Sequence, residues 1–429
     1  MARPSEILAG KFQHDVLWNL ASLVVLGASG ILLKVLIGRY YDAVALGVFN
    51  QTLAAWFLFS QIAVAGIDRS TLRAVAEHAH DRAQVTSIVA GALAATLLLA
   101  LVVTTAYWSS ISWLSSWFNH SANMPTSLLV ATPGLFFYAL NKVLLGVVNG
   151  TQRMRAFAVY QTVRYLVPLL GLVGFLVLDE QRTRGSELAV VFSIGECLLF
   201  LLLLVDVRQH LGFPIARGWQ EWTREHLHYG LKSVVSGVLF ELNTYVDIFV
   251  IGHFMTESAV GLYSFAAVFA LGFVQMLLVL QNVYNPILAR EIAARRFPEL
   301  ERTIALGRRW TYLGMVAAGS IGALLYPHAL RLLTGKEAFL ASWAPFNYLV
   351  FGTVLASGYV PFAQTLLMAG YPGWHTGYMI ATAALNAIAC WLAVPHFGLA
   401  GAAISTAASM FASVFILKAM VRWRVGLKI

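Results

Sequence analysis

Apolar runs of about 20 residues, each long enough to span a bilayer, recur along the whole chain. Backbone groups in hydrocarbon need internal hydrogen-bond partners, so such runs must form helices or a closed barrel. The runs are continuous stretches of Leu, Ala and Val without alternating polar residues, which favours helices. Only 11% of the residues are charged, against about 25% in an average soluble domain. The sequence therefore predicts an all-α polytopic membrane protein.

Twelve membrane spans are predicted, six on either side of one long polar segment. They cover residues 15–38, 43–67, 84–107, 127–148, 157–178, 187–206, 229–254, 261–287, 310–333, 345–369, 375–394 and 400–420. We expect an N-terminal lobe at 1–206, a cytoplasmic linker at 207–228 and a C-terminal lobe at 229–429. Trp219 and Trp222 stand among basic residues in this linker, which is typical of an amphipathic segment at the membrane interface.

An internal repeat relates the two halves of the chain. Residues 37–68 resemble residues 251–282 at a constant offset of 214, and no gap is needed. In this register Gly47 falls on Gly261. Because the first lobe holds an even number of spans, both lobes enter the membrane in the same direction. A pseudo-twofold axis along the membrane normal should then relate them, and transporters built this way usually bind substrate between the halves.

The distribution of Lys and Arg predicts the orientation of the chain. The loops on one side hold most of them, and the opposite loops hold only Arg39, Arg182, Arg184, Arg331 and Lys336. Both termini are therefore expected in the cytoplasm. The net charge of +9 largely reflects this bias, and its dispersal over short loops argues against nucleic-acid binding. No Cys, His or carboxylate group has metal-site spacing, so we expect neither a metal nor a cofactor.

Charged residues inside the spans are functional candidates, because charge at membrane depth is costly. Lys34 shares one helical stripe with Gly27, Gly30 and Gly38. One interpretation is a cation exposed in a cavity beside a glycine-lined wall. The other is a lysine that snorkels to the outer interface while the glycines pack against a helix.

Three acidic or amide positions in the seventh span are candidates for coupling or gating. The repeat register places Glu241 on the Lys34 face of the other half, so the two residues could form a pair of opposite charges on opposite lobes. Asn243 and Asp247 form a second stripe, one turn apart. For Asp247 the alternative is a structural carboxylate held by hydrogen bonds.

Lys142 and Arg164 lie within about two turns of the predicted cytoplasmic ends of their spans. Basic side chains bind phosphate oxygens strongly, so both could receive a diphosphate. Snorkelling is the alternative. Glu196 lies near mid-depth and cannot snorkel, so we expect it to pair with Arg164 or Lys142, or to bind a proton.

Amides also gather in the second and eighth spans, where Gln61 falls on Gln275 and Asp68 on Asn282 in the repeat register. Asn285 lies near Asn282 on the same sector. Side-chain amides can replace the water around a sugar. They are also common hydrogen-bond partners between membrane helices, so packing is an alternative.

Three segments carry a resemblance to a known superfamily: LIGRYYDAVALGVFNQ (36–51), NGTQRMRAFAV (149–159) and VDIFVIGHFMTESAVGLYSFA (246–266). With the twelve-span plan, the chain resembles the multidrug/oligosaccharidyl-lipid/polysaccharide (MOP) superfamily and its Wzx-type polysaccharide flippases. It departs from their usual first loop, which often carries Leu-Gly-Pro after the basic residue.

The resemblance implies two six-helix lobes that form a V around a central cavity. It also implies a bacterial inner-membrane protein that turns an oligosaccharide on undecaprenyl diphosphate from the cytoplasmic to the periplasmic leaflet. Lys34, Arg39 and Arg164 are the cations that would meet the diphosphate. Coupling to H⁺ or Na⁺ and contact with a polysaccharide polymerase or assembly proteins are further expectations.

Two other functions compete with the flippase. A cation-coupled multidrug exporter of the same fold would need an essential carboxylate, Glu241 or Asp247. A membrane glycosyltransferase, polymerase or ligase would need a large outward domain with catalytic groups. The outward loops are short and poor in charge, so no enzyme is expected.

Overall fold

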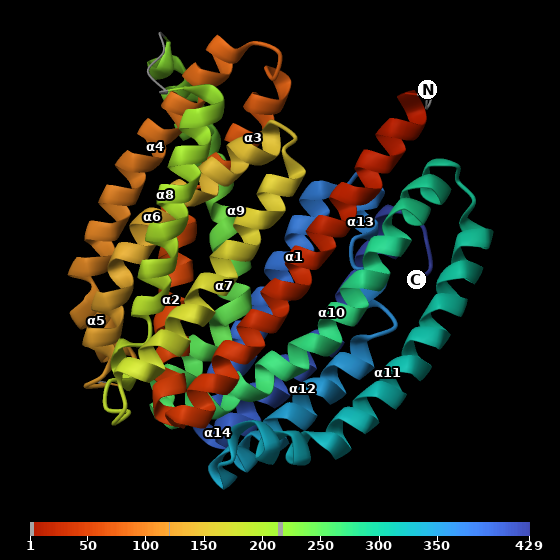
Figure 1. Cartoon of the computed structure of the whole chain (residues 1–429). Coiled ribbons are helices and arrows are strands. Elements are labelled where there is room, and N and C mark those ends of the chain that lie inside the picture. The colour runs from red at the N-terminus through yellow and green to blue at the C-terminus, as the bar shows by residue number, and fades with distance from the viewer. Residues whose placement is uncertain (1–3, 120, 213–217) are drawn as a thin grey trace. The chain divides into compact units, whose positions relative to one another are not determined.

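Regular structure is helical throughout the described residues of the computed structural model, 4–119, 121–212 and 218–429 (Figure 1). This confirms the prediction of an all-α chain. The helices are α1 (Pro4–Tyr40), α2 (Ala43–Val64), α3 (Ile67–Glu77), α4 (Arg82–Ser109), α5 (Ile111–Trp117), α6 (Met124–Gly150), α7 (Met154–Leu178), η1 (Gly185–Glu187), α8 (Val190–Leu211), α9 (Trp219–Phe254), α10 (Glu257–Ala293), α11 (Phe297–Thr334), η2 (Glu337–Ser342), α12 (Trp343–Ala356), η3 (Val360–Phe362), α13 (Thr365–Met368) and α14 (Pro372–Arg424).

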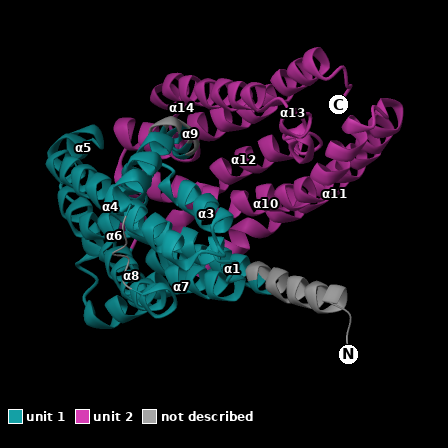
Figure 2. Cartoon of the chain, turned by 90° about the horizontal axis from the view of Figure 1, so that it is seen from above, with its two compact units in different colours: residues 1–41, 48–241 teal, residues 42–47, 242–429 magenta. Residues whose placement is uncertain are grey.

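The chain packs as two compact units (Figure 2). Unit 1 contains residues 1–41 and 48–241, and unit 2 contains residues 42–47 and 242–429. Helices α2 and α9 therefore contribute residues to both. In unit 1, α6 packs against α3, α4 and α8; in unit 2, α12 packs against α10, α11 and α14. The lobes expected from the order of the spans have different boundaries from these packing units and stay a prediction.

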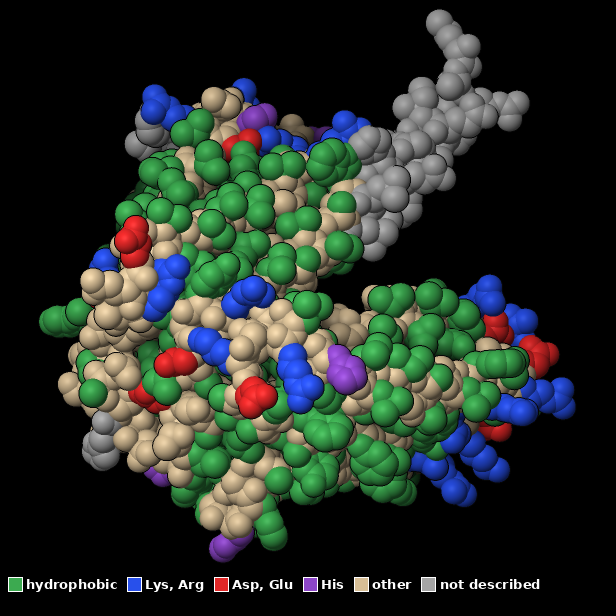
Figure 3. Space-filling view, turned by 60° about the horizontal axis from the view of Figure 1, so that its bottom comes forward, with side chains coloured by type: hydrophobic (Ala, Val, Ile, Leu, Met, Phe, Trp, Pro, Cys, Tyr) green, Lys and Arg blue, Asp and Glu red, His purple; other side chains and the backbone are tan. Residues whose placement is uncertain are grey.

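Ten helices among the described residues are long and apolar enough to cross a membrane. One of them, α14, turns at Gly398 (φ 57°, ψ −136°) and so holds the two predicted spans 375–394 and 400–420. The span predicted at 229–254 is the later part of α9. Hydrophobic side chains cover wide areas of the face in Figure 3, and Leu178 and Leu332 are 82% and 77% exposed. Such surfaces suit contact with lipid.

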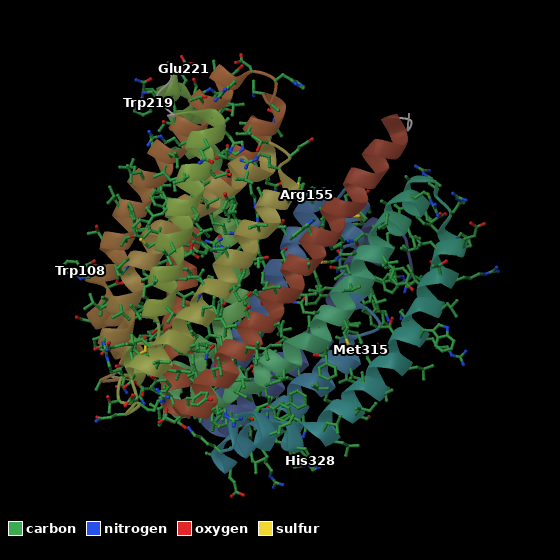
Figure 4. The ribbon with its side chains drawn as sticks, in the orientation of Figure 1. Trp108, Arg155, Trp219, Glu221, Met315 and His328 are labelled. Atoms are coloured by element: carbon green, nitrogen blue, oxygen red, sulfur yellow. The ribbon has the colours of Figure 1, made fainter. Side chains whose placement is uncertain are left out.

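The short helix α5, between α4 and α6, carries two tryptophans. Trp113 and Trp117 on this helix have ring centroids 5.9 Å apart. Figure 4 shows Trp108 on the outer side of α4, and its side chain is exposed. Exposed indoles at a helix end are what a membrane interface favours.

The segment expected as an interfacial linker is helical at both ends. Residues 219–228 begin α9 and belong to unit 1, so this part of the segment continues directly into the next span; its place at the membrane interface stays a prediction. Thr223 Oγ1 donates a hydrogen bond to the Gly91 carbonyl at 3.2 Å. A Cβ on Gly91 would lie 2.6 Å from that of Trp222, so only glycine allows α4 and α9 to approach so closely. Residues 213–217 of the predicted linker lie outside the described residues.

The two copies of the internal repeat touch each other at equivalent glycines. A Cβ on Gly47 would lie 1.8 Å from the carbonyl oxygen of Glu257, and one on Gly261 would lie 1.9 Å from that of Ala43. The offset of 214 relates Ala43 to Glu257 and Gly47 to Gly261, so the contact is reciprocal. A local twofold produces this pattern, and all four residues belong to unit 2.

We expect Gly47→Ala to destabilise the protein, because the new methyl must push the starts of α2 and α10 apart. Inserting a methyl into a packed contact typically costs about 1–3 kcal/mol. Melting of the purified protein in detergent measures this effect. Gly27→Ala is the matched control, since nothing lies within 4 Å of its Cβ position. Equal melting temperatures for the two variants would contradict the close contact.

A second interaction, in unit 1, holds the loop after α1. Tyr41 donates its hydroxyl to Asp179 Oδ2 at 2.7 Å, and the backbone N–H groups of Thr183 and Arg184 donate to the same carboxylate. Burial raises the pKa of Asp179, but the bonds from Tyr41, Arg184 and Thr183 outweigh it and hold this pKa below its usual value. Burial and the bond to Asp179 raise the pKa of Tyr41, which stays protonated as the donor.

Stability should therefore depend on pH through Asp179. A carboxyl with a lowered folded-state pKa stabilises the fold above its unfolded pKa of about 4, and this contribution is lost as the pH falls through the lower folded pKa. We expect Asp179→Asn to lower the melting temperature at pH 7, and the gap to wild type to shrink below about pH 4. A gap that is constant across this range would show that the ionised carboxylate is not what stabilises the loop.

Candidate functional site

The interior of unit 1 holds a paired arginine and glutamate. Arg164 on α7 donates Nε and Nη2 to the two oxygens of Glu196 on α8, at 2.7 and 3.0 Å. Their side chains are only 6% and 5% exposed. The expectation that Glu196 pairs with Arg164 or Lys142 is thus confirmed for Arg164. The carboxylate of Glu196 therefore neutralises Arg164 in this structure.

Helix α6 supplies the other groups around this pair. Asn141 Nδ2 donates to the backbone oxygen of Glu196 at 2.7 Å and to its Oε2 at 2.8 Å. The Arg164 guanidinium lies 4.1 Å from the centroid of the Tyr138 ring. Asn141 Oδ1 is buried and has no hydrogen-bond partner. Because Tyr138, Asn141 and Lys142 lie three or four residues apart, one face of α6 carries all three.

The same interior contains a second cation and a second carboxylate. Lys142 Nζ lies 5.8 Å from the Tyr138 ring centroid. Gln61 Nε2 donates to Glu241 Oε1 at 2.9 Å. Four formal charges, two of each sign, are therefore gathered in unit 1. The amide of Gln61 thus acts as a hydrogen-bond donor between helices, which matches the packing alternative.

Among the described residues, no hydrogen bond or ion pair joins Lys34 to Glu241, and both residues belong to unit 1, so their pairing stays a prediction. The first part of α9 bonds to α4 through Thr223 and to Ala65, just before α3, through Ser233. Lys34 is half-buried on α1, and Arg39 is exposed in the last turn of that helix.

Unit 2 contains a second polar cluster, around Asp247 on α9. Tyr263 OH and Thr406 Oγ1 donate to Asp247 Oδ2, the latter at 2.9 Å, and Asn386 Nδ2 donates to Oδ1 at 3.3 Å. Asn386 Oδ1 is buried without a hydrogen-bond partner. Among the described residues, no cationic side chain forms an ion pair with Asp247. The cluster is thus a carboxylate surrounded by neutral oxygen-bearing groups.

The predicted amides of α10 fall into two groups. Asn285 Nδ2 donates to Gln364 Oε1 at 2.8 Å, so this amide serves contact between helices. Gln275 and Asn282 are exposed, and their separation of seven residues puts them on one face of α10. Asn243 is half-buried, one turn before Asp247. The structure thus brings Asp247 together with polar partners but leaves Gln275 and Asn282 apart from both clusters.

Sequence reasoning missed several members of these clusters. Asn386 and Thr406 reach Asp247 from positions 139 and 159 residues away. A polar residue inside an apolar span was the available signal for Asn386, and Asn141 carried the same signal. Nothing local indicated that either would meet a carboxylate. In the described part of the chain, no group of three or more His, Cys, Asp or Glu side chains could hold a metal ion.

Solved structures with a similar fold are transporters and flippases. The lipid II flippase MurJ in an inward closed conformation is 15% identical, with a TM-score of 0.77, covering 95% of this chain and 87% of that one. An inward-facing multidrug resistance MATE transporter of the MOP superfamily is 14% identical, with a TM-score of 0.75 and coverages of 89% and 93%. A MOP superfamily transporter from Pyrococcus furiosus is 15% identical, with a TM-score of 0.53 and coverages of 94% and 95%.

At these identities the similarity establishes the two-lobe MOP fold alone. No curated protein matches the sequence. The profile of the family described as "Polysaccharide biosynthesis protein" matches residues 14–297, which is more than half of the 429 residues. The chain therefore belongs to the polysaccharide biosynthesis protein family.

Proposed function

We propose that this protein is a flippase that moves an oligosaccharide on a lipid diphosphate across the bacterial inner membrane by alternating access. Membership of the polysaccharide biosynthesis protein family supports the proposal, and the buried polar cluster of unit 1 is the observation that carries it. Sugars and phosphates cross hydrocarbon only at great cost. Unit 1 keeps Arg164, Lys142 and Tyr138 inside an apolar exterior, and these side chains would offer polar partners to the sugars and phosphates.

The cluster also suggests how binding is controlled. Arg164 and Lys142 balance Glu196 and Glu241, so a diphosphate would meet no net positive charge while all four groups are ionised. We propose that the substrate displaces Glu196 from Arg164, or that Glu196 takes up a proton first. A diphosphate has oxygens enough to accept both N–H donors that now hold Glu196.

The charge of Arg164 can be tested separately from its role in the fold. Arg164→Ala should abolish flipping, but it leaves Glu196 buried without an opposite charge, which costs about 3–5 kcal/mol. The double variant Arg164→Met with Glu196→Met removes both charges, so its melting temperature should recover. We expect its flipping rate to stay lost, measured as protection of a fluorescent lipid-diphosphate oligosaccharide in proteoliposomes. Normal flipping by the double variant would remove Arg164 from the substrate path.

We further propose that the Asp247 cluster binds the coupling cation, H⁺ or Na⁺. Asp247, the oxygen of Asn386 and the hydroxyl of Thr406 are the hard oxygen ligands that Na⁺ prefers, and an unpaired carboxylate also accepts a proton. The orphaned Oδ1 of Asn386 supports a missing ligand at this position.

Coupling predicts a specific effect of sodium on stability. Na⁺ should raise the melting temperature of the wild type, because a ligand that binds only the folded state stabilises it. Asp247→Asn should abolish this increase, whereas Asn282→Ala, an exposed amide on α10, should keep it. If Na⁺ has no effect on the wild type, flipping driven by a pH gradient becomes the measurement. Flipping that responds to a gradient equally in wild type and Asp247→Asn would exclude this site.

A cation-coupled multidrug exporter is the second candidate, since the Asp247 cluster suits coupling in either function. The contents of unit 1 discriminate between the two. A cationic dye should not bind near Arg164 and Lys142, whereas a lipid diphosphate should. Saturable dye binding that ignores the lipid would move the protein to the exporter class. We propose transport without catalysis, both termini in the cytoplasm, and a polymerase or assembly protein as partner.

A further inference from the structure

The tenth predicted span, 345–369, is broken inside unit 2. Helix α12 ends at Ala356, and the chain turns through Tyr359 and η3 before α13 begins at Thr365. Backbone outside a helix is tolerated at membrane depth only where protein groups satisfy it or where it lines a polar space. Tyr312 OH donates to the Leu355 oxygen at 3.0 Å, and Gln281 Nε2 donates to the Val360 oxygen at 3.0 Å. Side chains of α10 and α11 therefore stabilise the break.

Two cations meet at the tyrosine in this break. The Arg308 guanidinium, from α11, lies 4.1 Å from the Tyr359 ring centroid, and its Nη2 donates to the tyrosine hydroxyl. Lys418 Nζ, from α14, lies 5.3 Å from the same centroid and donates to the same hydroxyl at 3.4 Å. Tyr359 is only 8% exposed. Helices α11 and α14 thus bring two positive charges to one aromatic ring in the break.

Among the described residues, no acidic side chain forms an ion pair with either cation. None of the ion pairs between described residues includes Arg308 or Lys418. Arg308 Nε is buried and has no hydrogen-bond partner. The contrast with Arg164 is direct, because the Nε of that arginine is bonded to Glu196. A buried guanidinium donor without an acceptor costs free energy, so this site lacks a group that accepts hydrogen bonds.

The remaining donors indicate what that group is. The hydroxyl oxygen of Tyr359 accepts from both Arg308 and Lys418, so its own proton is left to donate. Arg308 Nε, Lys418 Nζ and the Tyr359 hydroxyl therefore offer donors only, together with two positive charges. Phosphate presents several strongly accepting oxygens with negative charge, and it matches this set.

Snorkelling alone does not account for the arrangement. An isolated lysine or arginine near a span end extends its head to water, as the exposed Lys418 could do. Arg308 instead folds onto a buried ring and hides its Nε. Arg308 lies two turns before Met315, which Figure 4 shows within α11, and so at the predicted cytoplasmic end of the span 310–333. Lys418 is two residues from the corresponding end of the span 400–420. Lipid phosphates lie at this depth.

We propose that Arg308, Lys418 and Tyr359 form a binding site for the phosphate group of a lipid in unit 2. If the proposed function holds, the diphosphate of the oligosaccharide carrier occupies it before or after the unit 1 cluster. A phospholipid of the bilayer offers the same chemistry, so the two sources must be separated by experiment.

The test measures lipid binding to the purified full-length protein by native mass spectrometry. The probes are a short-chain prenyl diphosphate, phosphatidylglycerol and the net-neutral phosphatidylcholine. We expect the paired change Arg308→Gln with Lys418→Gln to weaken binding of one anionic probe by about tenfold or more. Tyr359→Phe, which keeps the ring and removes the hydroxyl group, should weaken binding of this probe less. Arg309→Gln, the exposed neighbour, is the matched control and should bind as wild type does.

Each outcome has a separate meaning for the two proposals. Loss of diphosphate binding alone assigns the site to the carrier, and loss of phosphatidylglycerol binding assigns it to the bilayer, even if the protein flips nothing. If the paired variant binds every probe as wild type and Arg309→Gln do, the phosphate site is overturned while the flippase proposal stands. If the paired variant melts far below wild type, Tyr359→Phe decides the question in its place.

Discussion

Hydrocarbon offers no hydrogen bonds, so each polar group that this chain takes into the membrane must find its partner within the protein. The main features of the structure follow from this constraint. Carboxylates, amides and cations occur in clusters, and the break between α12 and α13 is stabilised by Tyr312 and Gln281. Arg308 Nε and Asn386 Oδ1 are two buried atoms that lack a hydrogen-bond partner, and each supports one of the binding sites proposed above.

The two buried arginines illustrate two ways of holding a cation. Arg164 is balanced by Glu196, so it can bind an anion only by exchanging one partner for another. Arg308 rests on an aromatic ring beside a second cation and needs no exchange. A transporter that must release its cargo benefits from both types. An anion would bind Arg164 only after displacing Glu196, whereas an anion at Arg308 and Lys418 would displace no carboxylate.

The sequence predicted features that depend on local composition. Apolar runs identified the spans, and Glu196 was expected to need a cation because a carboxylate at mid-depth cannot reach water. It did not reveal partners that meet through tertiary packing. Asp247 could not be connected with Thr406, and Tyr359 lay hidden in an apolar run that appeared continuous. Arg308 was assigned to a loop because it precedes its span. Hydrophobic periodicity reports which residues prefer lipid, but it carries no information on where a chain interrupts a helix to expose a ring.

The contact between Gly47 and Gly261 retains the twofold symmetry of the internal repeat. If the two halves descend from one shorter chain that assembled as a homodimer, the two glycines were originally the same residue in two subunits. A mutation of that residue then placed two new side chains at the same contact. Fusion separated the two positions genetically but left them in mutual contact. After fusion each half could diverge nearly everywhere else, as the two polar clusters have. At this contact, however, a substitution of either glycine is still limited by the residue that faces it.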